Sequence, residues 1–238
     1  MSGPPVVLGL GVTPEVVAGF AARHSLRAED RGKGIPFAPV IVLLAGVDDE
    51  RLGQAAERGF HACYEILDAD QEDQGVALRL LPTLTQGGLY LSLSTAAAHT
   101  TNVARHFRRR LEAWLDLPMI IAADIEMALH EAVSNAVVHG NLEIPLSMPG
   151  KQDGLSGYAR LIEERLAEAR FAARRVEVAA RSEDHAVHIA VQDQGPGYGA
   201  RSSFGSTLTG HGLQLIHGIA RSVSVGEGGR RITMEFAR

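Results

Sequence analysis

Residues 119–140 read MIIAADIEMALHEAVSNAVVHG, and their apolar residues recur at the spacing of one face of an α-helix. The positions expected to face the core are Ile125, Leu129, Ala132, Val133 and Ala136. Glu131, Asn135 and His139 follow each other at i, i+4 and i+8, so they form a polar strip along the edge of that face. A carboxylate beside a carboxamide suits a general base next to a ligand for a hard cation. A solvated helix flank is the alternative, because it would have the same spacing.

A second polar site is predicted after the strand at 185–193, where residues 191–197 read VQDQGPG. Asp193 at the strand end can accept a hydrogen bond from the amine of a base. Gly195 and Gly197 allow the backbone to approach the ring of that base closely. A tight turn between the strand and the following loop is the alternative, since it would use the same residues.

A third segment, residues 209–213, reads TGHGL and opens a predicted helix over 212–223. Free backbone amides at a helix N-terminus, with glycines nearby, can bind an anion without a lysine. The sequence has lysine only at Lys33 and Lys151, both in predicted loops, so a Walker A phosphate loop is excluded. A glycine-rich hinge is the alternative for this segment.

Together, the three segments resemble the N, G1 and G2 boxes of the GHKL (Bergerat) ATPase superfamily. The matching patterns are Glu-x3-Asn-x3-His-Gly, Asp-x-Gly-x-Gly and Gly-x-Gly before a helix, and the resemblance covers residues 88–238. It implies a two-layer α/β sandwich that binds ATP and Mg²⁺. By the resemblance, Asp193 reads the adenine amine, and Asn135 binds Mg²⁺ through its amide oxygen. The remaining nucleotide-binding positions that it implies are His139, Gly195, Gly197, Gly210, His211, Gly212, Leu213 and Thr233.

Within the superfamily, the chain is most similar to the anti-sigma-factor serine kinases of bacterial signalling. A strand and a long helix at Leu89–Leu115 precede residues 119–140 without the phosphoacceptor hairpin of a histidine kinase. Glu131 matches the catalytic base of these kinases, and the segment between Gly197 and Gly210 is short. An insertion at 145–172 departs from the simplest members. The resemblance implies transfer of the ATP γ-phosphate to Ser or Thr of a protein partner, either an anti-sigma antagonist or a sigma factor.

The remaining elements of residues 88–238 are expected to alternate between helices and strands. We predict a strand over 89–94, a helix over 96–115, a surface insertion over 145–160, a helix over 158–173, and strands over 174–182, 185–193 and 230–237.

Residues 1–80 form a separate predicted domain of parallel α/β type, with buried strands at 6–12, 39–46 and 61–67 and helices at 14–24 and 48–59. This region resembles a truncated, flavodoxin-like receiver domain. Its phosphorylation chemistry is missing: no Asp ends a strand where the acceptor belongs, Leu44 and Ala45 occupy the signalling Ser/Thr region, and no lysine lies near Glu65. A pseudo-receiver that serves for contact or dimerisation is therefore expected, with an unrelated small α/β cap as the alternative.

Composition limits the other classes of function. The 238 residues have a formal net charge of −5, which gives no electrostatic case for direct nucleic-acid binding. Cys63 is the single cysteine, which excludes an intrachain disulfide and fits a reducing cytoplasm. No apolar run reaches the length of a membrane span, so no membrane association is expected.

Three hypotheses about function remain open at this stage. The first is the Ser/Thr protein kinase described above. The second is a histidine-kinase-like ATPase, with His99 or His106 as phosphoacceptor. The third is a nucleotide-sensing module that transfers no phosphate.

Overall fold

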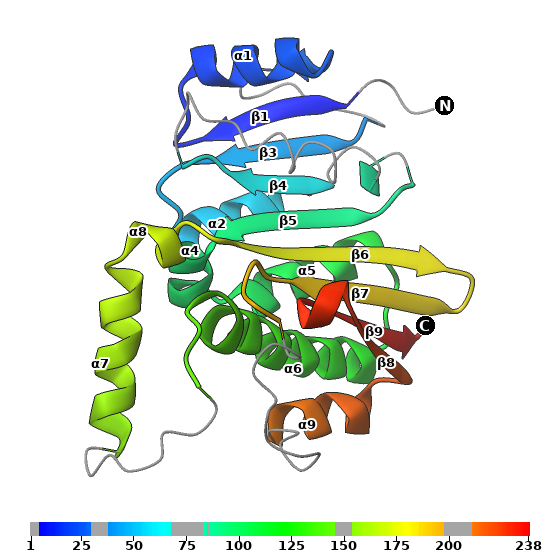
Figure 1. Ribbon diagram of the computed structural model, residues 1–238. Coiled ribbons are helices and arrows are strands. Elements are labelled where there is room, and N and C mark those ends of the chain that lie inside the picture. The colour runs from blue at the N-terminus through cyan, green and yellow to red at the C-terminus, as the bar shows by residue number, and fades with distance from the viewer. Residues whose placement is uncertain (1–4, 30–37, 68–82, 85, 146–153, 198–210) are drawn as a thin grey trace.

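The computed structural model describes residues 5–29, 38–67, 83–84, 86–145, 154–197 and 211–238 (Figure 1). These residues form a mixed α/β structure around one nine-stranded sheet of order β2-β1-β3-β4-β5-β6-β7-β9-β8. The strands are β1 Val6–Leu10, β2 Arg27–Ala28, β3 Val40–Leu44, β4 Ala62–Glu65, β5 Leu89–Ser94, β6 Arg175–Glu183, β7 Ala186–Gln192, β8 Ser222–Gly226 and β9 Arg231–Ala237. The helices are α1 Pro14–Arg23, α2 Asp49–Glu57, α4 Thr95–Thr100, α5 Val103–Trp114, α6 Met119–Asn135, the π-helix η1 Ala136–Asn141, α7 Gly154–Leu166, α8 Ala169–Ala172, α9 His211–Ile219 and the 3₁₀ turn η2 Glu227–Gly229.

The strands of the sheet change from parallel to antiparallel pairing at β5. Strands β2, β1, β3, β4 and β5 pair in parallel, whereas β5, β6, β7, β9 and β8 pair antiparallel. Apolar strands with helical crossovers favour the parallel half, and strands that alternate between apolar and polar residues favour the antiparallel half.

One face of the sheet holds the main core. Alternate residues of each strand, such as Val176 and Val178 of β6, point to this face and pack against α2, α5, α6 and α9. The opposite face is covered by α1 at the parallel half, where Val17 and Phe20 pack on Ile41 of β3. The antiparallel half is thus a sheet with its helices on one side, and α6 lies beside both α5 and α9 (Figure 1).

The two regions that the sequence separates at residues 80–88 share this one sheet. Ala62 and Tyr64 of β4 pair in register with Tyr90 and Ser92 of β5. The two regions are also joined on the sheet face that α2 and α5 cover. There Asp49 of α2 accepts hydrogen bonds from the Asn102 amide at 2.8 Å and from Arg105 at 2.6 Å. The expected boundary therefore lies within a continuous sheet.

Several helices differ in extent from their sequence-based prediction. The helix predicted over 96–115 is broken at Thr101, because Asn102 Oδ1 accepts from the Arg105 amide and begins α5 as a new helix. The helix predicted over 212–223 ends at Ile219, and residues 222–226 form the edge strand β8. Part of the predicted surface insertion, from Gly154 onwards, is the first part of α7.

None of the helices in the described part of the chain is both long enough and apolar enough to cross a membrane.

Candidate functional site

Glu131 and Asn135 lie one turn apart on α6 and contact each other directly. Asn135 Nδ2 donates to Glu131 Oε1 over 3.0 Å, and both side chains are half-buried. Because the amide nitrogen is used by the carboxylate, the Asn135 amide oxygen keeps its lone pairs for another partner. The first two residues of the predicted polar strip therefore form a coupled pair with a carboxylate and a free oxygen ligand.

His139 does not continue this strip. Residues 136–141 form a π-helix, whose hydrogen bonds run from i to i+5, so the angle between successive residues changes after Asn135. His139 Nδ1 lies 2.7 Å from the carbonyl oxygen of Ile144, at the turn that follows η1. The imidazole is thus held at the end of the helix by the chain that follows it.

Asp193 is a buried carboxylate at the end of β7. Its side chain leaves the residue 7% exposed, and Asp193 Oδ1 accepts from the Gly195 amide over 2.7 Å. Burial raises the pKa of the Asp193 carboxyl to about 6, while the Gly195 amide and the Arg230 and Arg174 guanidinium groups act in the opposite direction. The group is mostly ionised at neutral pH and holds a strong hydrogen-bond acceptor in a low-dielectric position.

The absence of a side chain at Gly140 allows the backbone of η1 to contact the Asp193 carboxylate. A Cβ added at Gly140 would lie 2.5 Å from Asp193 Cγ and 2.7 Å from Oδ1, and one at Gly195 would overlap the Gly140 carbonyl. Gly197 has φ +84 and lies against the Gly228 carbonyl, a conformation and a contact that a side chain would strain. Close backbone packing therefore joins the end of the α6–η1 helix to the Asp-x-Gly-x-Gly loop.

The N-terminus of α9 lies on Glu131. A Cβ at Gly212 would overlap the Glu131 carboxylate in its present position, so the two residues are in close contact. Leu213 is half-buried against the main core. The backbone of His211 begins α9, and Gly210 lies outside the described residues. The first turn of α9, with its free amides, is thus next to the pair of Glu131 and Asn135.

Thr233 is not brought to Asp193. It pairs with Ala190 in the ladder of β7 and β9, between the core residues Ile232 and Met234. Because side chains alternate along a strand, Thr233 points to the sheet face opposite the helices, whereas Asp193 contacts the helix layer. The resemblance-based role of Thr233 at the adenine site has no support in this geometry.

Asn141 is a residue of the site that the sequence analysis missed. It is fully buried, and its Oδ1 accepts from the Gln194 amide at 2.7 Å. Its Nδ2 donates to Thr95 Oγ1 at 2.9 Å and to the Arg175 carbonyl at 3.0 Å. Asn141 thereby holds the loop after Asp193 to η1 and β6. The position of this asparagine, directly after His139 and Gly140 of the first polar segment, was the feature of the sequence that could have identified it as part of the site.

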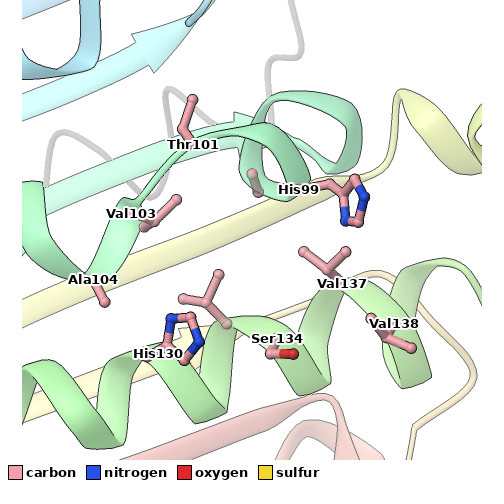
Figure 2. Close-up of a pocket in the computed structure, with 10 residues that line it drawn as sticks. His99, Thr101, Val103, Ala104, His130, Ser134, Val137 and Val138 are labelled. Atoms are coloured by element: carbon pink, nitrogen blue, oxygen red, sulfur yellow. The ribbon is translucent and has the colours of Figure 1, made fainter. Parts of the chain in front are cut away.

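A separate cavity of about 250 Å³ lies on the other flank of α6, away from Glu131 and Asn135. Figure 2 shows it between the turn joining α4 to α5 and the end of α6, with His99 and His130 at its rim. Buried apolar residues of both elements, Val103, Ala104, Val133 and Val137, line it together with Thr101 and Ser134.

Within the described residues, no group of three or more His, Cys, Asp or Glu side chains is arranged to hold a metal ion. A metal at the Glu131–Asn135 pair would therefore take most of its ligands from a bound phosphate or from water. No family model matches the sequence, and no curated protein is significantly similar to it.

Proposed function

We propose that residues 88–238 bind ATP in a Bergerat-type site and that the chain is a protein serine/threonine kinase of the anti-sigma-factor type. The observation that carries the proposal is the convergence of three distant segments: Glu131 and Asn135, the first turn of α9, and the loop of Asp193 all meet at one helix. The sequence patterns alone had tight-turn, hinge and helix-flank alternatives, which do not require such contacts.

The adenine end of the proposed site is Asp193. Its buried carboxylate accepts one hydrogen bond from Gly195 and has lone pairs left for the adenine amine. Glycine at positions 140 and 195 lets the end of the helix pack directly on the loop, and this contact supports the Asp193 carboxylate in its position.

The phosphate end is the first turn of α9 with Asn135. The free amides of a nine-residue helix point towards an anion, and their partial positive charge stabilises it. The Asn135 amide oxygen would be a ligand for Mg²⁺, which neutralises phosphate charge when bound. This arrangement fits a chain in which lysine occurs only at Lys33 and Lys151.

Glu131 is the proposed general base for transfer to a Ser or Thr hydroxyl. Its carboxylate is held by Asn135 and lies against Gly212 at the start of α9, next to the proposed phosphate position. A carboxylate there can orient the hydroxyl and take its proton. The partner would be an anti-sigma antagonist or a sigma factor in the cytoplasm.

Residues 1–80 are proposed to be a receiver-like layer without phosphorylation chemistry. The order β2-β1-β3-β4 within this region, continued by β5 of residues 88–238, supports a flavodoxin-like arrangement. At the carboxyl end of β3, Arg51 Nη1 donates to the Ala45 carbonyl at 2.9 Å and also to the Gly46 carbonyl. A guanidinium and two carbonyls at this position favour a contact role over a phosphoacceptor.

The histidine-kinase alternative loses one of its two candidates. His106 is 4% exposed, and its Nε2 lies 2.9 Å from Asp49 Oδ1, so a phosphate donor has no access to it. His99 is exposed at the rim of the cavity on the far flank of α6.

The test starts with a pull-down from native lysate with the purified chain, followed by incubation of the bound proteins with γ-labelled ATP and Mg²⁺. Acid-stable label on a captured protein is the expected result. Acid-labile label would favour the histidine-kinase alternative, and tight ATP binding without any label would favour the nucleotide-sensing module.

A further inference from the structure

The outward face of α6 is an uncharged stripe. Met119 is 87% exposed, Ile120 is 71% exposed and Met127 is 48% exposed. The exposed positions that continue the stripe are Ala123, His130 and Ser134. A helix on the surface of a protein ordinarily presents charged residues to water. A largely apolar stripe of about 22 Å, at 1.5 Å per residue, indicates that another molecule covers it.

The two ends of the stripe differ in shape. Met119 protrudes at the N-terminal end of α6, whereas the cavity of about 250 Å³ opens beside His130 and Ser134 at the C-terminal end. At about 100° per residue, Met119 and His130 differ by about 20° around the helix, so the protruding side chain and the cavity lie on the same flank. The stripe therefore has a protruding apolar side chain at one end and, on the same flank at the other end, a cavity with the apolar walls Val133 and Val137.

We infer that this stripe is the surface through which two copies of the chain associate. A two-fold axis near Met127, perpendicular to α6, pairs the helix antiparallel with α6 of a second copy. Such an axis places the N-terminal end of the stripe of one copy opposite the C-terminal end of the stripe of the other. The flank of α6 that carries Met119 and the cavity lies on the same side of the interface in both copies. Met119 of each copy then enters the cavity of the other, against Val133 and Val137.

Charge is compatible with this arrangement. The stripe itself has no ionised group, and the carboxylate nearest to the axis, Glu126 on the same flank, is paired with Arg108 at 2.5 Å. Asp116, exposed just before α6, would be opposite the other copy's Val138, where His99 forms the cavity rim (Figure 2). A carboxylate that faces an imidazole is a complementary pair. An interface built around one helix pair is small, so the expected dissociation constant is micromolar.

Sedimentation over a wide range of protein concentrations tests the dimer. The parent chain should approach the mass of a dimer as concentration rises. Met119→Glu should weaken association by about tenfold or more, since it replaces an apolar contact with Val133 and Val137 of the other copy by a charge. Val225→Glu is the matched control, because Val225 is 51% exposed on β8, away from the stripe, and it should leave the dimer unchanged.

A disulfide test then checks the axis. Met127→Cys should cross-link readily under mild oxidation, because residue 127 of each copy faces its equivalent. Met119→Cys should not, because its two copies lie about 24 Å apart along the helices. Cys63 is buried and does not interfere.

The inference would be overturned if the parent chain stayed monomeric at every concentration. It would also be overturned if Met119→Glu and Val225→Glu had equal effects on association, or if the two cysteine variants cross-linked equally. Binding of a different protein to the stripe without self-association would also overturn it.

Discussion

Asn135 donates its side-chain amide to the carboxylate of Glu131 across one turn of α6, over 3.0 Å. This hydrogen bond fixes which Asn135 atom faces the proposed metal, and it orients the carboxylate proposed to act as base. Gly212 packs on the same carboxylate, so the pair is held between two helices. The two side chains therefore have separable roles that substitution can distinguish.

We expect Glu131→Gln and Asn135→Ala to fail differently. Glu131→Gln keeps the shape and removes the base, so ATP affinity should persist while phosphoryl transfer falls by roughly 10²–10⁴-fold. Asn135→Ala removes the metal ligand, so Mg²⁺-dependent affinity and transfer should fall together. Calorimetry with and without Mg²⁺, alongside a transfer assay, measures both, and Ser134→Ala on the same helix is the control. Parental transfer rates in Glu131→Gln would remove Glu131 from the mechanism.

Asp193→Asn should stabilise the ligand-free protein at alkaline pH. The pKa of Asp193 is raised from 3.8 to about 6, so the folded state binds this proton more tightly than the unfolded state. Ionisation thus costs stability above about pH 6, and the free energy of unfolding of Asp193→Asn should exceed the parent's by about 2–3 kcal/mol at pH 8. The difference should shrink as pH falls through 6 and vanish below 3.8.

Urea denaturation at pH 8, 6 and 4 measures this difference, with the exposed Asp184→Asn as the matched control. A constant difference across these pH values would contradict the burial of an ionised Asp193.

Asn141→Ala should destabilise the fold by about 2–4 kcal/mol, because it leaves the buried Arg175 carbonyl and the part-buried Gln194 amide without their side-chain partner. Asn102→Ala, which removes only the N-cap of α5, should cost about 1 kcal/mol. The urea midpoints of the two variants compare them directly. Equal losses would mean that the Asn141 network contributes no more than an exposed cap.

Residues 1–80 should stay unmodified by a small phosphodonor. The carbonyls at the end of β3 are occupied by Arg51, and no aspartate ends that strand. Incubation with acetyl phosphate and Mg²⁺, followed by borohydride reduction and mass spectrometry, should detect no acyl phosphate. A modified aspartate in this region would show that it is a working receiver.

The sequence predicted well what depends on local periodicity. The helix at 119–135 and strands β6, β7 and β9 follow from the spacing of their apolar residues, and the juxtaposition of Glu131 with Asn135 follows from helical geometry. The π-helix was not predictable, because nothing in AVVHGN distinguishes hydrogen bonds from i to i+5 from the i to i+4 pattern of an α-helix.

The pairing of strands that are distant in the sequence could not be predicted either. The pattern of β4 predicts a buried strand, but nothing in it specifies β5 as the neighbour that makes the sheet continuous. The face on which Thr233 lies depends on the register of β9 with β7, which pairs it with Ala190. A one-residue shift in that register would have turned Thr233 to the other face of the sheet.

The most direct test of the central claim is calorimetric titration of ATP, ADP and GTP into the purified chain with Mg²⁺. Asp193 should accept from the adenine amine, whereas the carbonyl of guanine would meet it as a second acceptor. We expect ATP and ADP to bind about tenfold to a hundredfold more tightly than GTP, and Asp193→Asn to lose most of this preference. Equal affinities for ATP and GTP, or no binding of ATP, would contradict the central claim.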